Sequence, residues 1–319
     1  MNKFFEKLNE LINEYNDFIV IGHKDPDMDS LGSCLGLYQI IEQKGKNVNL
    51  FLEDKSLIEY NSNINQAFSK LEKSINCINS KDLKKISKNS LLIILDVHSK
   101  ERIEYPKLVD LFDVAIIDHH IKSKNYIKDT KLLYLDSNLS SVSELIAYYA
   151  EYLNIELDPV IATILLAGIE IDTNSFNLKT TNRTYLSASL LMEMGADSIL
   201  KQELLKETKE EYMKRASHIK NSFMATDNIA MCIINTGSSS LELANVAEEL
   251  LNFEDVEASF VIGKISNDEI GISARSIGDI DVANIMEQMG GGGHFSNAAC
   301  QIKNKTIKEV KLELLDIIK

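Results

Sequence analysis

Hydrophobic positions in the first half of the chain come in short runs separated by longer helical patterns. The runs are rich in β-branched residues and predict buried strands at 17–22, 48–52, 91–95 and 114–117. Apolar positions at helical spacing predict helices at 30–44, 141–153, 158–171 and 183–194. Continuous apolar strands alternating with helices are typical of a parallel sheet buried on both faces. We therefore expect an α/β fold whose N-terminal domain has a mostly parallel sheet flanked by helices.

The pattern changes after residue 200. A charged helical stretch without strand character predicts a connector helix at 201–225, although a solvated surface helix fits the same pattern. Beyond it, strands are expected at 229–234, 258–265 and 271–274, and helices at 240–251, 281–288 and 306–318. The chain thus divides into an N-terminal domain at 1–200, the connector helix, and a smaller C-terminal α/β domain at 226–319.

Composition narrows the functional classes. The formal net charge is −14 and the pI is about 5.0, which argues against a broad basic face for long nucleic acid. A small phosphorylated substrate is still compatible with this negative net charge, because bound divalent cations supply positive charge that a residue count misses. The four cysteines form no CxxC pair, so we expect a reduced, cytoplasmic protein. No apolar run approaches the ~20 residues that span a bilayer, and we expect no membrane partner.

Polar side chains that could bind metal follow the first predicted strand. The segment GHKDPDMDS at 22–30 supplies His23, Asp27 and Asp29. In open α/β sheets, ligands bind in the crevice beyond the carboxyl ends of the strands. The structural alternative is that the pair Asp29-Ser30 caps the helix that follows.

Three further strand or helix ends carry similar groups. Asp96 follows the run at 91–95; by itself, an aspartate there is more often a turn or cap residue. Asp118, His119 and His120 end the run at 114–117, and neutral imidazole is a frequent metal ligand. Asp172 closes the apolar helical segment IATILLAGIEI, where a carboxylate is costly unless it is paired. A capping role and a ligand role are equally compatible with Asp172 alone.

Together these positions form a ligand set without thiolate. Its members are His23, Asp27, Asp29, Asp96, His119 and Asp172. Nitrogen and oxygen ligands suit Mn²⁺ or Mg²⁺ better than a structural zinc site. Six side chains exceed the usual protein ligands of one open-site ion and match two ions that share a carboxylate. Paired metals are a recurrent solution for displacement at phosphorus.

The C-terminal domain carries a glycine run, 290–293, followed by His294. Consecutive glycines let main-chain N–H groups approach an anion closely, so we favour phosphate binding over a flexible linker. Arg275 follows a predicted strand and is a candidate phosphate clamp, although a surface arginine in a turn fits nearly as well.

These signals, in this order, resemble the DHH phosphoesterase family over essentially the whole chain. HKDPDMDSLGS, LDVH, IDHH and GIEIDT resemble its four catalytic motifs, and GGGGHFSNAAC resembles the signature of the DHH-associated C-terminal domain. The segments YLDSNLSSVSELI, DTNSFNLKTTNRTY and GISARS resemble the corresponding segments of bacterial cyclic-di-AMP phosphodiesterases. Ile121-Lys122 stands where the membrane-bound members of that branch tend to have an arginine pair.

The resemblance implies roles for individual residues. One Mn²⁺ would be held by His23, Asp27 and Asp96, and the second by Asp29, Asp96, His119 and Asp172. Mg²⁺ or Co²⁺ could replace Mn²⁺. Asp118 would support a neighbouring imidazole, and His120 would face the scissile phosphate, so that His120, Asp96 and Asp118 form the catalytic set. The expected substrate contacts of the C-terminal domain are Arg275, Gly291, Gly292, Gly293, His294 and Asn297.

The activity that this resemblance implies is hydrolysis of cyclic-di-AMP to pApA, with AMP as a further product. The alternatives are a nano-RNase or pAp phosphatase that acts on short linear oligonucleotides, a manganese pyrophosphatase, which the GGGGH run disfavours, and a non-catalytic nucleotide-binding module. Family members are often homodimers. The start at Met1 favours a stand-alone enzyme over a piece of a larger one.

Overall fold

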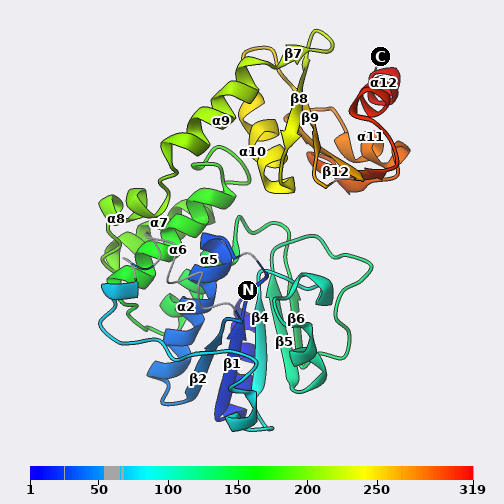
Figure 1. Ribbon diagram of the computed structural model, residues 1–319. Coiled ribbons are helices and arrows are strands. Elements are labelled where there is room, and N and C mark those ends of the chain that lie inside the picture. Colours follow the sequence, from blue (N-terminus) through cyan, green and yellow to red (C-terminus); the bar gives the residue numbers. More distant parts are fainter. Residues whose placement is uncertain (25, 54–64, 66–67, 267, 319) are drawn as a thin grey trace. The chain divides into compact units, whose positions relative to one another are not determined.

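The computed structural model describes residues 1–24, 26–53, 65, 68–266 and 268–318, without the side chain of His294 (Figure 1). The chain forms two compact units, Met1–Lys206 and Glu207–Lys319. The division lies within the segment for which a connector helix is expected. Each unit has a sheet and a hydrophobic core of its own.

The N-terminal unit is built on a sheet of six parallel strands in the order β3-β2-β1-β4-β5-β6. The strands are β1 (Asp17–Ile21), β2 (Asn47–Phe51), β3 (Cys77–Ile78), β4 (Leu91–Leu95), β5 (Asp113–Asp118) and β6 (Leu132–Leu135). The four strands expected from the sequence are confirmed; β3 and β6 were not expected. The chain order reverses between β1 and β4. In doubly wound sheets this switch point is where the carboxyl ends of two strands leave a crevice for ligands.

The side chains of alternate residues in each strand pack into two separate hydrophobic cores, one on each face of the sheet. Phe18 and Val20 of β1 face helices, whereas Ile19 and Ile21 face the opposite side of the sheet. The helices of this unit are α1 (Asn2–Glu14), α2 (Met28–Gln43), α5 (Val142–Tyr152), α6 (Pro159–Asp172), α7 (Asn182–Glu193) and α8 (Ser198–Leu204). Figure 1 shows α2, α5 and α6 together on one face. Side chains from short 3₁₀ turns, such as Leu108, cover the other face.

Helices α2 and α6 touch at glycines. A Cβ atom at Gly168 would lie 2.8 Å from the Cα of Asp29 and 2.9 Å from the carbonyl oxygen of Met28. A Cβ at Gly32 would lie 3.1 Å from the carbonyl oxygen of Ile164. Only glycine permits this backbone approach. The packing places the C-terminus of α6 beside the first turn of α2.

The C-terminal unit has a mixed sheet in the order β11-β12-β10-β9-β8-β7, in which only β8 and β9 are parallel among the described pairs. The strands are β7 (Phe223–Met224), β8 (Ile229–Gly237), β9 (Ala258–Lys264), β10 (Glu269–Ser276), β11 (Gly292–His294) and β12 (Asn297–Lys303). The helices are α9 (Lys209–Lys220), α10 (Ser240–Leu250), α11 (Val282–Gln288) and α12 (Ile307–Ile318). The expected strands and helices are present; β7, β11 and β12 were not expected.

The segment 201–225 departs from the sequence prediction. In place of one connector helix the structure has two, because α8 ends at Leu204 and α9 begins at Lys209. The break has a local cause. Thr208 accepts a hydrogen bond from the backbone N–H of Glu211, whose carboxylate accepts from the backbone N–H of Thr208. This reciprocal capping box starts a new helix.

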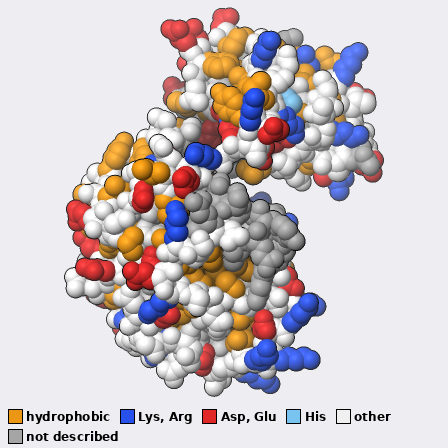
Figure 2. Space-filling model, turned by 60° about the vertical axis from the view of Figure 1, so that its left-hand side comes forward, with side chains coloured by type: hydrophobic (Ala, Val, Ile, Leu, Met, Phe, Trp, Pro, Cys, Tyr) orange, Lys and Arg blue, Asp and Glu red, His pale blue; other side chains and the backbone are white. Residues whose placement is uncertain are grey.

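Charged side chains of both signs lie on the surface, although acidic residues outnumber basic ones in the sequence. On the face in Figure 2, acidic and basic side chains are interspersed over each unit, as far as the chain is described. None of the helices in the described ranges has both the length and the apolar character that crossing a membrane requires.

Candidate metal centre

The loop after β1 brings an imidazole and a carboxylate to the switch point of the sheet. His23 Nδ1 lies 2.8 Å from the carbonyl oxygen of Lys24, so this nitrogen is the N–H donor and Nε2 is left as an acceptor. His23 Nε2 faces Asp27 Oδ2 at 3.7 Å. The other oxygen of Asp27 accepts from the backbone N–H of Ser30 and caps α2. The capping residue is therefore Asp27, not the pair Asp29-Ser30, and its second oxygen stays available for a metal.

Asp96 lies at the centre of the cluster. It follows β4 with φ 61°, a left-handed conformation that costs on the order of 1–3 kcal/mol for a residue other than glycine and is concentrated at functional sites. Its Oδ2 is 3.3 Å from His23 Nε2, and its Oδ1 is 3.3 Å from His119 Nε2. One oxygen thus faces each side of the cluster, as a bridging carboxylate requires.

His119, Asp172 and Asp29 form a second group of possible ligands, beside the Oδ1 atom of Asp96. His119 Nε2 lies 3.1 Å from Asp172 Oδ2 and 4.0 Å from Asp29 Oδ2. Asp172 is the last residue of α6, where the helix dipole disfavours a negative charge, so a cation nearby would be stabilising.

Helix α5 orients Asp29. The backbone N–H groups of Val142 and Ser143, at the first turn of α5, donate to the two carboxylate oxygens of Asp29 at 2.8 and 2.6 Å. Ser141 caps this helix by accepting from the backbone N–H of Glu144. The sequence prediction missed this arrangement, although the pattern Ser141-x-x-Glu144 is a recognisable helix-start signal.

The six predicted ligands converge on a set that fits a pair of hard cations. His23, Asp27 and Asp96 have ligand atoms within 4.8 Å of one another, as do Asp29, His119 and Asp172. Asp96 Oδ1 is buried without a hydrogen-bond partner among the described residues. Leaving a buried carboxylate oxygen unpaired is costly, and a cation would satisfy it. Oxygen and imidazole ligands suit Mn²⁺, Mg²⁺ or Co²⁺.

Burial and close contacts shift the pKa values of the candidate ligands. Burial lowers the pKa of His23, but Asp27 and Asp96 outweigh it and raise that pKa to about 10. Burial likewise opposes the raised pKa of His119, which follows from its contacts with Asp172 and Asp96. Burial raises the pKa of Asp29, and the charges of Asp172 and Asp96 raise it further. Burial also raises the pKa of Asp172.

Asp118 and His120 form a hydrogen-bonded pair beside the cluster. Asp118 Oδ1 accepts from the backbone N–H of His120 at 3.0 Å and from its Nδ1 at 2.7 Å. Burial raises the pKa of Asp118, but the hydrogen bonds from His120 and His98 outweigh it and lower that pKa well below its usual range. His120 Nε2 is thus the nitrogen left for other partners, on a side chain that is 37 % exposed. His98, the last residue of the LDVH motif, was assigned no role from the sequence.

In the C-terminal unit, four of the predicted substrate contacts surround one cavity. It has a volume of about 340 Å³, and its lining includes Arg275, Gly292, Gly293 and Asn297. Arg275 Nη1 donates to Ser273 Oγ at 3.3 Å and to the carbonyl oxygen of Ala274 at 3.0 Å. Burial lowers the pKa of Arg275.

Two further residues, Gly291 and His294, were also predicted to contact the substrate. Gly291 is outside this lining, and a Cβ there would lie 2.3 Å from the carbonyl oxygen of Ala299, so packing against β12 explains this glycine. The run 290–293 is only partly a loop, because Gly292–His294 forms β11. The side chain of His294 lies outside the described residues.

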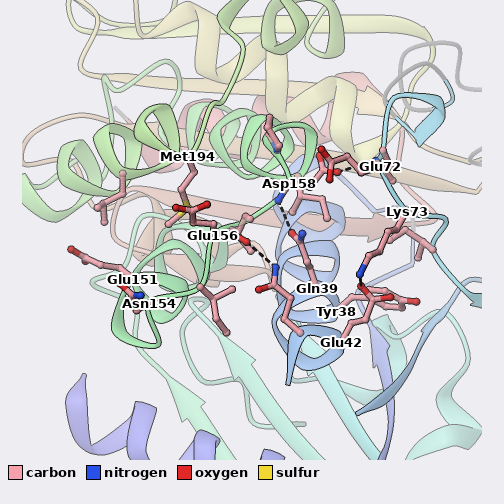
Figure 3. Close-up of a pocket in the computed structure, with 18 of the residues that line it drawn as sticks. Tyr38, Gln39, Glu42, Glu72, Lys73, Glu151, Asn154, Glu156, Asp158 and Met194 are labelled. Atoms are coloured by element: carbon pink, nitrogen blue, oxygen red, sulfur yellow. Dashed lines mark hydrogen bonds and ion pairs between the residues drawn. The ribbon is translucent and has the colours of Figure 1, made fainter. Parts of the chain in front are cut away.

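The N-terminal unit also has a cavity, of about 870 Å³, which lies at the C-terminal end of α2 and the N-terminal end of α6, away from the candidate metal centre (Figure 3). It is lined by more carboxylates than amines. Asp158 accepts hydrogen bonds from the backbone N–H groups of Val160 and Glu72, and Gln39 accepts from that of Asp158. No group of metal-ligating atoms lies there among the described residues. Its polar groups serve the helix ends.

Comparison with known proteins agrees with this architecture. Residues 17–169 match the DHH family, N-terminal domain, and residues 226–319 match the DHHA1 domain. The chain is 36 % identical over 321 residues to the cyclic-di-AMP phosphodiesterase GdpP of Geobacillus thermodenitrificans, covering 98 % of this chain and 48 % of the relative. The chain therefore spans about half the length of that curated relative.

Two other similarities differ in coverage. The bifunctional oligoribonuclease and PAP phosphatase NrnA of Mycoplasma genitalium is 28 % identical, with 97 % of this chain and 95 % of the relative covered. An exopolyphosphatase-related protein of Bacteroides fragilis has a similar structure, with a TM-score of 0.79 and 17 % identity, covering 99 % of this chain and 96 % of that one. The latter likeness concerns the fold alone.

Proposed function

Because the chain belongs to the DHH phosphoesterase family, combining its N-terminal domain with a DHHA1 domain, we propose that it is a metal-dependent phosphodiesterase that hydrolyses cyclic-di-AMP to pApA. The observation that carries the proposal is the convergence of two three-residue ligand groups on Asp96. The substrate is inferred from the similarity to GdpP.

The N-terminal unit supplies the groups that would hold two cations. His23, Asp27 and Asp96 would bind one, and Asp29, Asp96, His119 and Asp172 the other. When bound, paired divalent cations supply a hydroxide at neutral pH and neutralise charge that develops on phosphate oxygens. The α5 N-terminus holds Asp29 with two N–H bonds, so that its remaining lone pairs are directed to the cluster. Such outer hydrogen bonds fix ligand orientation.

His120 would act on the phosphate that is cleaved. Asp118 occupies Nδ1, and the partly exposed imidazole can donate a hydrogen bond or a proton through Nε2. This fits a stabiliser of the negative oxygen or a general acid for the departing 3′-oxygen. In the C-terminal unit, Arg275 and Asn297 with the glycines 291–293 and His294 would bind the rest of the dinucleotide. A half-buried guanidinium such as that of Arg275 suits a phosphate oxygen.

A second candidate is hydrolysis of short linear oligonucleotides or pAp. The match to NrnA favours it, because this chain covers nearly all of that relative but only about half of GdpP. A non-catalytic nucleotide-binding module is disfavoured by the complete ligand set.

A substrate panel with Mn²⁺ separates these functions. The purified chain is incubated with cyclic-di-AMP, cyclic-di-GMP, pApA, pAp and pyrophosphate, and the products are followed by chromatography. We expect the cyclic-di-AMP ring to open to pApA faster than any other conversion. If the ring stays closed while pAp or the linear dinucleotide pApA is consumed, the second candidate is the better explanation. Failure to bind Mn²⁺ would favour the binding module.

A further inference from the structure

A buried imidazole lies behind the Asp118–His120 pair. His98 is 5 % exposed and follows β4, two residues after Asp96. Both of its ring nitrogens have partners. The backbone N–H of Ser123 points at Nε2 at 2.9 Å, and Nδ1 forms a short hydrogen bond with Asp118 Oδ2.

These contacts fix where the proton of His98 resides. A backbone amide can only donate, so Nε2 accepts and carries no proton. The proton of the neutral ring is therefore on Nδ1, which donates to Asp118. The oxygens of Asp118 are then divided, with Oδ2 serving His98 and Oδ1 serving the backbone N–H and Nδ1 of His120.

We propose that His98 is a positioning residue that holds the Asp118 carboxylate in the one rotation that presents His120 Nε2 to the substrate. This rests on the proposed phosphodiesterase function, in which His120 faces the phosphate. Without the bond to His98, His120 is the one residue in the described part of the chain that still donates hydrogen bonds to the Asp118 carboxylate, and His120 is held less tightly. Loss of a hydrogen-bond partner behind an active group typically lowers activity by about 10- to 100-fold.

A purely structural role for His98 is the competing explanation. The backbone carbonyl of His98 accepts from the N–H of Ile127, and Nε2 holds Ser123, so the residue also fixes the segment 123–127. The two roles use different nitrogens. Substitutions that retain one nitrogen at a time can therefore tell them apart.

Two substitutions each retain one of the two hydrogen-bonding functions of the His98 ring. His98→Asn keeps an N–H donor near the place of Nδ1 and loses the acceptor for Ser123. His98→Gln keeps an acceptor near the place of Nε2 and loses the donor to Asp118. We expect His98→Asn to keep kcat within about threefold of wild type and His98→Gln to lose about 10- to 100-fold in kcat, with KM and Mn²⁺ affinity nearly unchanged. Tyr149→Phe, which removes another buried polar atom of this unit, is the control and should keep full activity.

Equal losses in the two variants, or a loss confined to KM, would overturn the proposal. A second test uses the His120→Ala background. Because His98 acts through His120, His98→Gln should cost less than about twofold in kcat there. An undiminished loss in that background would also overturn the positioning role.

A measurement without substrate keeps this inference separate from the proposed function. Histidine ring ¹⁵N resonances of the full-length chain with Mg²⁺ report which nitrogen is protonated, and the signal missing in His98→Asn identifies His98. We expect protonated Nδ1 and unprotonated Nε2. A proton on Nε2 instead of Nδ1 would contradict the positioning role of His98 even if the enzyme is active. The expected tautomer in a chain that cleaves no nucleotide would show that the proposed function has failed.

Discussion

The two units build their candidate sites in different ways. In the N-terminal unit, ligands come from the loop after β1, the ends of β4 and β5, the start of α2 and the end of α6. In the C-terminal unit, the candidate contacts are neighbours on paired strands. Arg275 is opposite Asn297 in the pairing of β10 with β12, and Asn297 is opposite His294 in the pairing of β12 with β11.

Under the proposed function, this difference would separate chemistry from substrate recognition. A centre assembled from distant elements depends on the whole α/β topology, because each ligand is placed by a different strand or helix. A row across three antiparallel strands, here β10, β12 and β11, depends on the register of those strands alone. We therefore expect changes in the N-terminal centre to reduce metal binding and turnover, and changes in the C-terminal row to reduce substrate binding.

Removing Asp96 should have the largest effect. Asp96→Ala deletes the only carboxylate among the described residues that faces both ligand groups, and we expect kcat to fall by more than about a thousandfold, since both cations lose a ligand. Initial rates over a range of Mn²⁺ concentrations measure this. Asp110→Ala, which changes an exposed carboxylate paired with Lys100, is the control and should be active. Near-normal rates at high Mn²⁺ would contradict a bridging role.

Widening the contact between α2 and α6 should weaken metal binding without removing a ligand. Gly168→Ala places a methyl group against the backbone of Asp29 and should shift Asp29 away from Asp172. We expect Mn²⁺ affinity to fall by about 10- to 100-fold, in the range seen when groups that support metal ligands are lost. Isothermal titration measures this.

Gly36→Ala is the matched control for that packing effect. It also crowds α2, with a Cβ 2.7 Å from a methyl group of Ile146, but lies about two turns further along the helix than Asp29. It should lower thermal stability while leaving Mn²⁺ affinity within about threefold of wild type. Equal losses of affinity in both variants would mean that general destabilisation, not the spacing of Asp29 and Asp172, controls the centre.

The fold was largely predictable because its signals are local. Continuous apolar runs such as Leu91–Leu95 coincide with observed strands. Cys77–Ile78 is too short to produce a periodic pattern, and Leu132–Leu135 is mostly half-buried, so neither was predicted. The break after Leu204 could have been found from Thr208-x-x-Glu211, because a capping box marks a helix start.

The site was predictable only in part. Side chains that end strands, such as Asp96 and His119, were found because a parallel sheet brings strand ends together. The donors that orient Asp29 are backbone groups 113 and 114 residues away in the chain, and no local pattern connects them. The contact between His98 and Asp118 likewise depends on β4 and β5 being neighbours.

Changing the arginine of the C-terminal unit should affect binding alone. Arg275→Lys keeps the charge but loses the planar, forked donor arrangement, so we expect KM for the dinucleotide to rise by about 10-fold with Mn²⁺ affinity unchanged. Steady-state kinetics and metal titration measure the two quantities. Arg215→Lys, which changes an arginine of the same unit that pairs with Glu207 and Glu249, should leave KM as it is. A fall in kcat or in metal affinity for Arg275→Lys would break the separation of recognition from chemistry.

The pH dependence of metal binding should again distinguish the two sites. The pKa of His23 is raised to about 10, so this imidazole holds a proton in the metal-free chain at neutral pH, and the pKa values of His119 and Asp29 are also raised. Metal ligands must be deprotonated, so binding releases protons and affinity rises with pH, about tenfold per pH unit for each proton released. Titrations between pH 6 and 8 in buffers of different ionisation enthalpy count these protons. Dinucleotide binding by Arg275, whose charge does not change in this range, should add no such dependence. Metal affinity that is flat with pH would mean that protons do not balance the carboxylates of this centre.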